Sequence, residues 1–154
     1  MTLTLTSHAF DQGEGIPKKY SCEGDDVSPG LRWAGVPEGT KSLLLVCDDP
    51  DAPGGTFHHW AVYNIPPDRD GLPEGFGPES LEGGLRQAVN DFGRPGYGGP
   101  CPPRGHGLHH YHFRLSALSE PNLPVGPDAS CVEVQEAARP YEISFVELVG
   151  TYER

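Results

Sequence analysis

The chain of 154 residues is poor in lysine and contains no long hydrophobic run. Lys18, Lys19 and Lys41 are its only lysines, and the formal net charge is −11. Because nucleic-acid backbones are bound by clustered lysine and arginine, nucleic acid is not an expected partner. No apolar run approaches the length needed to cross a bilayer, so no membrane span is expected.

The sequence also lacks the signs of an exported protein. Its N-terminus shows neither the charged segment nor the apolar core of a secretory leader. The four cysteines, Cys22, Cys47, Cys101 and Cys131, are widely spaced and form no CxxC pair. We therefore expect a cytoplasmic protein with reduced thiols, although disulfides would become possible if the mature chain were exported.

Motifs for common chemistries are missing as well. The chain has no G-x-S-x-G elbow, Walker A loop, GxGxxG loop or zinc-type spacing. Cys101 is the one thiol near the histidine clusters, and a small residue filling a turn is the favoured interpretation. On a strand, His110 and His112 would lie on the face opposite His109, so these ligands would not converge. We expect no metal, no other cofactor and no catalytic residue.

Glycine and proline are abundant, with 21 and 17 residues, which predicts a loop-rich fold with rigid turns. Ser130 followed by Glu133 is typical of a capping box, and a helix is expected over Cys131–Ala138 before Pro140. The stretch Asp68–Gly105 is expected to be irregular. Apolar runs and alternation predict strands at Met1–Phe10, Leu31–Trp33, Ser42–Cys47, Phe57–Ile65, Gly107–Leu118 and Ile143–Tyr152. Many strands and about one helix indicate a single domain over 1–154, a mostly antiparallel β-sandwich.

Six of the seven histidines fall into two short clusters, each between a Pro/Gly turn and the start of an apolar strand. Alternation places His109 and Tyr111 on the core-facing side of their strand and leaves His110, His112, Arg114 and Ser116 on a solvated side. By the same reasoning, His59 shares the core-facing side with Ala61, Tyr63 and Ile65. Two histidines at core-facing strand ends indicate a pocket, although ordinary core histidines remain the alternative.

A pocket of this kind suits a small anion. Imidazolium groups and free backbone amides both favour negative charge, and the amides of Gly98–Gly99 permit close approach of a ligand. Asp49 and Asp51 lie in a proline-rich turn after a strand. They form either an acid/base couple or ordinary turn residues, and the sequence alone leaves both interpretations open.

These motifs together resemble the phosphatidylethanolamine-binding protein family, and in particular its prokaryotic branch related to Raf kinase inhibitor protein. The resemblance runs from about Tyr20 to the C-terminus. It is carried by Asp49-Pro50-Asp51-Ala52-Pro53, by His59-Trp60, by Gly98-Gly99-Pro100-Cys101-Pro102-Pro103 with Gly105, and by His109 and Tyr111.

The resemblance implies two antiparallel sheets, one or two short helices and an anion pocket at one end of the sandwich. Members of the family bind phosphate, phosphorylated head groups and carboxylates, and some regulate kinases or inhibit proteases. Prokaryotic members often form homodimers. In this chain His110 stands where arginine is common. The matching pocket residues are Asp49, His59, Gly99, Pro103, His109 and Tyr111, with Asp51, Ala52 and Pro53 shaping the wall.

The sequence therefore predicts a non-catalytic protein that binds a small anionic ligand, either a phosphate-bearing molecule or a phosphorylated head group. Two alternatives remain. One is a phosphoester or acyl hydrolase that uses Asp49 and His59 as an acid/base pair. The other is an adaptor that inhibits a protease or kinase, with the rim of the pocket docking the partner protein.

Overall fold

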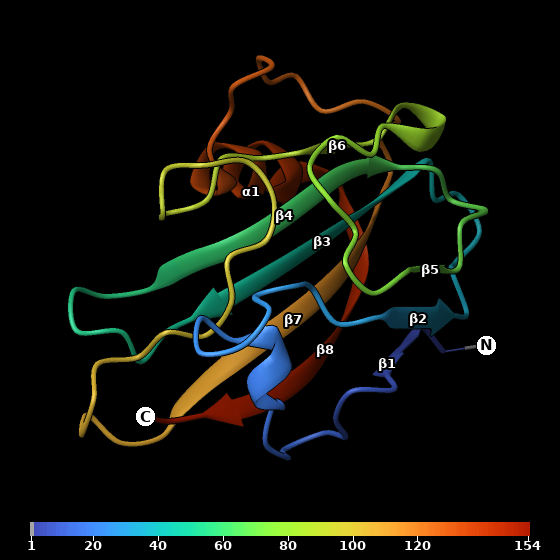
Figure 1. Ribbon diagram of the computed structural model, residues 1–154. Helices are drawn as coiled ribbons and strands as arrows, with labels where there is room; N and C mark the ends of the chain where they lie inside the picture. Colours follow the sequence, from blue (N-terminus) through green and yellow to red (C-terminus); the bar gives the residue numbers. More distant parts are fainter. Residues whose placement is uncertain (1) are drawn as a thin grey trace.

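Two antiparallel sheets face one another in the computed structural model, which describes residues 2–154 (Figure 1). The large sheet has the order β6-β4-β3-β7-β8, and the small sheet has the order β1-β2-β5. The strands of the large sheet are β3 (Ser42–Asp49), β4 (Phe57–Ile65), β6 (Arg86–Gln87), β7 (His109–Leu118) and β8 (Glu142–Tyr152). Those of the small sheet are β1 (Thr4–Ser7), β2 (Leu31–Ala34) and β5 (Gly71–Leu72).

Strand β3 lies at the centre of the large sheet, between β4 and β7. Its side chains are almost all buried, and alternate residues belong to two different cores. Leu43 and Leu45 pack between the sheets, whereas Leu44 and Val46 pack beneath the helix. The continuous apolar run of β3 is thus explained by cover on both of its faces.

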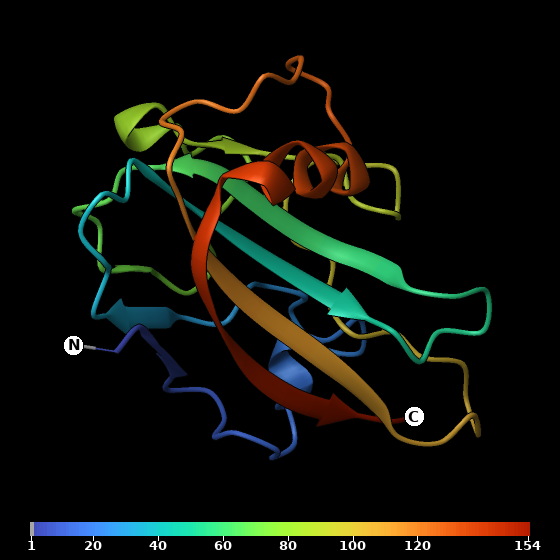
Figure 2. The same cartoon turned by 180° about the vertical axis from the view of Figure 1, so that it is seen from behind.

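The two faces of the large sheet are covered differently (Figures 1 and 2). The small sheet lies over one face, and helix α1 (Cys131–Ala138) lies over the other. The core between the sheets contains Trp33, Trp60 and Phe113, while the core under the helix contains Tyr63 and Val134. The expected β-sandwich is confirmed.

Helix α1 has the predicted bounds and the predicted capping box. The backbone N–H of Glu133 donates to Oγ of Ser130 (3.2 Å), and the N–H of Ser130 donates to Oε1 of Glu133 (3.1 Å). These bonds satisfy donors that the first turn of a helix leaves unpaired. A 3₁₀ turn, η3 (Arg139–Tyr141), follows and leads directly into β8.

Some predicted bounds were too wide. The first strand covers Thr4–Ser7, and Met1 lies outside the described residues. The stretch 68–105 contains β5, β6 and the 3₁₀ turn η2 (Glu82–Gly84); another 3₁₀ turn, η1 (Lys18–Tyr20), follows β1. Ser116 is buried rather than solvated, because its hydroxyl donates to Glu142 across the outer face of the sheet.

The expectation that all four cysteines are reduced is wrong. Cys22 and Cys101 form a disulfide that links positions 79 residues apart, with their Cα atoms 5.4 Å apart. The pairing could not be read from spacing, because the two loops meet only in the folded chain. Cys47 and Cys131 are free and buried. Across residues 2–154, no helix is long and apolar enough to cross a bilayer.

Candidate functional site

A cavity of about 210 Å³ opens at one end of the large sheet, where β3 ends and β4 and β7 begin. Because β3 is antiparallel to both of its neighbours, these three strand ends meet at one edge of the sheet. The sequence prediction that the two histidine clusters meet is confirmed. The cavity is lined by Asp49, Ala52, Pro53, Phe57, His59, Phe92, Cys101, Pro102, Pro103, His109 and Tyr111.

His59 reaches the cavity through a β-bulge, which simple alternation did not predict. Cys47 pairs with Trp60 and Asp48 pairs with His58, so His59 is the extra residue on β4. A bulge re-aims a side chain, and here it leaves His59 on the cavity side next to Trp60. Strict alternation would have grouped His59 with Ala61, which packs under the helix. The predicted position of His59 is therefore right, but the periodicity argument behind it is wrong.

Asp49 holds His109 in a fixed orientation. Nδ1 of His109 lies 2.6 Å from Oδ2 of Asp49, and both side chains are almost fully buried. A carboxylate oxygen only accepts, so Nδ1 carries the proton that is donated to Asp49. Nε2 of His109 in turn lies 2.6 Å from Nδ1 of His106, which is on the exposed loop before β7. His106 is therefore part of the site, although the sequence analysis did not select it.

His59 is held by a different partner. Its Nδ1 lies 2.7 Å from the carbonyl oxygen of Gly98. Because a carbonyl only accepts, Nδ1 carries the proton of the neutral ring and Nε2 carries none. Only 3% of His59 is exposed, and this burial lowers the pKa of its imidazole below the usual 6.5. His59 is consequently a neutral hydrogen-bond acceptor at pH 7.

The hydroxyl of Tyr111 is the unpaired polar group of the cavity. It is buried and has no hydrogen-bond partner among the residues that the structure describes. Its ring lies edge-on to His59, with 5.2 Å between the ring centroids. Burial and the nearby charge of Asp49 raise the pKa of this phenol, so it remains a donor at neutral pH.

The amides of Gly98 and Gly99 are not free to receive an anion, contrary to the expected mechanism. The N–H of Gly98 donates to the carbonyl of His59 (3.0 Å), and that of Gly99 donates to Asp26 (2.8 Å). A Cβ at Gly99 would lie 2.1 Å from the carbonyl oxygen of Tyr20. Glycine is required at this position for close packing, and Gly99 does not line the cavity.

Asp51 shapes the turn beside the cavity and does not line it. Its backbone N–H donates to Asp49 Oδ1 (2.8 Å), and its own carboxylate accepts from the backbone and ring of His110 (2.8 Å each). These bonds lower the pKa of the Asp51 carboxyl. The predicted wall residues Ala52 and Pro53 and the predicted pocket residue Pro103 do line the cavity.

The aromatic part of the lining was not predicted. Phe57 was treated as an ordinary strand residue, and Phe92, although it lies in a stretch that resembles the family, was given no role in the pocket. Cys101 lines the cavity as half of the disulfide, so it offers no thiol to a substrate. Within residues 2–154, no group of three or more His, Cys, Asp or Glu side chains is arranged to hold a metal ion.

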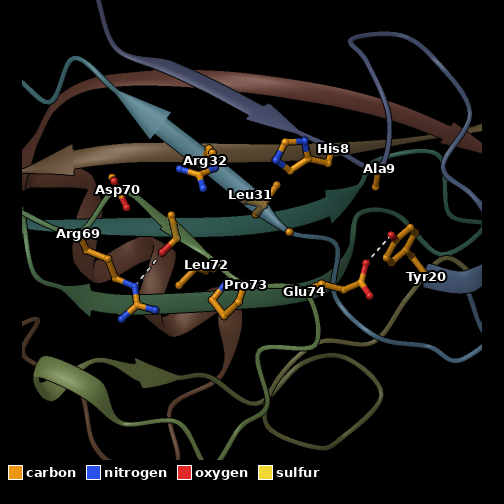
Figure 3. Close-up of a pocket in the computed structure, with 12 residues that line it drawn as sticks. His8, Ala9, Tyr20, Leu31, Arg32, Arg69, Asp70, Leu72, Pro73 and Glu74 are labelled. Atoms are coloured by element: carbon orange, nitrogen blue, oxygen red, sulfur yellow. Dashed lines mark hydrogen bonds between the residues drawn. The ribbon is translucent and has the colours of Figure 1, made fainter.

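Two larger hollows lie elsewhere on the protein. One of about 450 Å³ borders β2 and β5 (Figure 3). Tyr20 donates to Glu74 at one end of this hollow, and Arg69 donates to the carbonyl of Gly71 at the other end. The other, of about 560 Å³, lies on the helix side of the large sheet, where Arg114 pairs with Glu142. The smaller cavity is distinguished by its unpaired buried donor.

Comparisons with known proteins agree with this architecture. Residues 6–153 match the family described as phosphatidylethanolamine-binding protein. A protein of Aquifex aeolicus, named UPF0098 protein, is 49% identical over 152 residues, covering 99% of this chain and 89% of the relative. The crystal structure of Escherichia coli YbcL, described as a member of the mammalian PEBP family, superposes with a TM-score of 0.93. It is 38% identical, and the match covers 99% of this chain and 98% of YbcL.

A more distant structure shares the fold alone. A carboxypeptidase Y inhibitor, solved in complex with its cognate proteinase, superposes with a TM-score of 0.59 at 16% identity. The match covers 98% of this chain and 82% of the inhibitor.

Proposed function

The chain belongs to the phosphatidylethanolamine-binding protein family, and from that premise we propose that it binds a small phosphate-bearing anion in the cavity between Asp49, His59, His109 and Tyr111 without transforming it. The family supports a binding role in general terms. The particular ligand class is inferred from the polar groups of the cavity.

The observation that carries the proposal is the Tyr111 hydroxyl. A buried hydroxyl without a partner is costly, and such a group in a native protein usually serves a ligand or a bound water. An anionic oxygen placed beside it would accept the missing hydrogen bond. His59 lies against the same ring and supplies a second donor once it is protonated.

His109 contributes charge while Asp49 fixes its orientation. The pairing with His109 partly compensates the negative charge of Asp49, so this carboxylate repels a bound anion less strongly. A ligand oxygen reaches Nε2 of His109 when the ring of His106 moves away from that nitrogen. The site then presents the Tyr111 hydroxyl and two imidazolium groups to one anion.

The test is calorimetry with inorganic phosphate on the wild type and on Tyr111→Phe. A hydrogen bond to a charged group contributes about 1.5–3 kcal/mol, so the variant is expected to bind about tenfold more weakly or worse. Its free energy of unfolding should not fall, because the lost hydroxyl has no partner in the folded protein. Undiminished phosphate binding by Tyr111→Phe, or absence of binding by the wild type, would refute the proposal.

One observation favours a hydrolase as the second candidate. A buried carboxylate that orients an imidazole is the arrangement of a general base. In this structure the oriented histidine is His109, whereas Nδ1 of His59 is bonded to the Gly98 carbonyl. The pair to test is therefore Asp49 with His109. Turnover of phosphoesters or acyl esters that is abolished by Asp49→Asn would establish the enzyme.

The adaptor role, the homodimer and the cytoplasmic localisation stay predictions. The disulfide bears on localisation, because disulfides persist mainly in oxidising compartments. Fractionation of cells with detection of the oxidised and reduced forms of the chain would test the predicted compartment.

A further inference from the structure

Most of the cavity lining plays no part in receiving a bare anion. The donors are His59, His109 and Tyr111, but the remaining wall is largely apolar. Apart from Asp49, it consists of Ala52, Pro53, Phe57, Phe92, Cys101, Pro102 and Pro103. A small hydrated ion would gain nothing from this surface, whereas an organic substituent on the anion would remove it from water.

Phe92 and Phe57 give the apolar wall an aromatic character. Phe92 is 40% exposed, which is high for a large hydrophobic side chain. Its ring meets that of Phe57 edge-on, with 4.7 Å between centroids, and that of His59 at 5.5 Å. His59 in turn lies edge-on to Tyr111 at 5.2 Å. Aromatic rings thus form a continuous surface from the exposed ring of Phe92 to the buried hydroxyl of Tyr111.

The ring of Phe92 is held in place although it is partly exposed. A Cβ at Gly98 would lie 2.3 Å from the Phe92 ring, so glycine lets that ring approach the backbone this closely. The guanidinium of Arg94 lies over the ring at 5.2 Å, and the backbone N–H of Phe92 donates to Asn90 (2.9 Å). These contacts position the ring before any ligand arrives, which lowers the entropic cost of binding.

We propose that the ligand is a small aryl anion, with its charged group at Tyr111 and His59 and a single aromatic ring against Phe57 and Phe92. This inference rests on the proposed anion-binding function and adds the nature of the organic part. Aromatic pairs prefer edge-on or offset geometry, which the existing rings offer to an incoming ring. The volume of about 210 Å³ is below the range of about 300–1,000 Å³ that drug-sized ligands occupy, so one ring is the limit.

The experiment compares the affinities of phenyl phosphate, cyclohexyl phosphate, methyl phosphate and inorganic phosphate by calorimetry. Phenyl phosphate is expected to bind about tenfold more tightly than methyl phosphate, with cyclohexyl phosphate between them. In Phe92→Ala the advantage of phenyl phosphate over methyl phosphate should largely disappear. The circular dichroism spectrum of this variant should match that of the wild type, which shows that the variant is folded.

Phe145→Ala is the matched control, because Phe145 is 50% exposed on β8 and does not line the cavity. It should retain the full advantage of phenyl phosphate. Equal affinities of the wild type for phenyl and methyl phosphate would overturn the aryl assignment while leaving anion binding intact. Cyclohexyl phosphate binding as tightly as phenyl phosphate would also overturn it. A wild type that binds none of the four anions would refute the underlying function as well.

Discussion

Nδ1 of His106 lies 2.6 Å from Nε2 of His109 and covers the one ring nitrogen of His109 that Asp49 leaves free. One proton is shared across this contact, since two N–H groups cannot point at each other over such a distance. Protonation of both rings therefore breaks the contact. An anion that binds to His109 competes with His106 for the same position.

This competition predicts the effect of removing His106. His106→Ala should bind inorganic phosphate about twofold to tenfold more tightly at pH 7, because a typical hydrogen bond contributes about 0.5–1.5 kcal/mol. Calorimetry measures the change. His112→Ala is the control: His112 lies on the opposite face of β7, near Glu147, and its removal should leave affinity unchanged. Weaker binding by His106→Ala would show instead that His106 is itself an anion ligand.

The pKa of His59 predicts the pH dependence of binding. Burial lowers this pKa below 6.5 in the free protein, and a bound anion raises it by stabilising the imidazolium. By linkage, affinity should increase as pH falls from the pKa of the complex to that of the free protein, and should level off below it.

A phosphodiester such as dimethyl phosphate is the appropriate probe, because a monoester loses its second charge near pH 6 and blunts the gain. His59→Gln should flatten the profile, and His112→Ala should not. A wild-type affinity that is independent of pH between 7 and 5 would show that the anion is not held by His59. NMR titration of the imidazole resonances would identify the titrating ring directly.

The Cys22–Cys101 disulfide predicts a response to reductant. It closes a loop across 79 positions of the chain, and a loop closed by a disulfide contributes about 2–4 kcal/mol to stability. Dithiothreitol should therefore lower the melting temperature of the wild type. Phosphate affinity should also weaken, because Cys101 is part of the cavity wall.

The double variant Cys22→Ala/Cys101→Ala provides the control for this prediction. It should resemble the reduced wild type in melting temperature and should not respond to dithiothreitol. Its two remaining cysteines, Cys47 and Cys131, are buried and unpaired, so they offer the reductant no bond to break. A wild type indifferent to reductant would contradict the assigned role of the disulfide.

Local patterns were sufficient to predict most of the fold. The bounds of β4 and α1 match the predicted ranges, because an apolar run between turn residues and a capping box are determined by neighbouring residues. The site residues Asp49, His59, Pro103, His109 and Tyr111 do line one cavity, as the resemblance implied. Their role in binding a ligand stays a prediction.

What escaped prediction depends on contacts between distant segments. The N–H of Gly99 is occupied by Asp26, which is 73 residues away, and no local pattern reports that bond. Cys22 and Cys101 are likewise joined only by the folded loops. Ser116 is buried because Glu142, on the adjacent strand, accepts its hydroxyl. Whether a polar residue is buried depends on its hydrogen-bond partner, and that partner becomes a neighbour only in the folded chain.

The bulge on β4 also decides which of two adjacent histidines reaches the cavity. His58 lies on the helix side, where its ring is 2.8 Å from Asp48 and 3.4 Å from the side-chain nitrogen of Gln135. Without the extra residue, strict alternation would turn His59 to the side of Ala61, and the cavity would lose the imidazole that lies against Tyr111. The irregular pairing is thus what allows a core tryptophan and a site histidine to occupy neighbouring positions on one face.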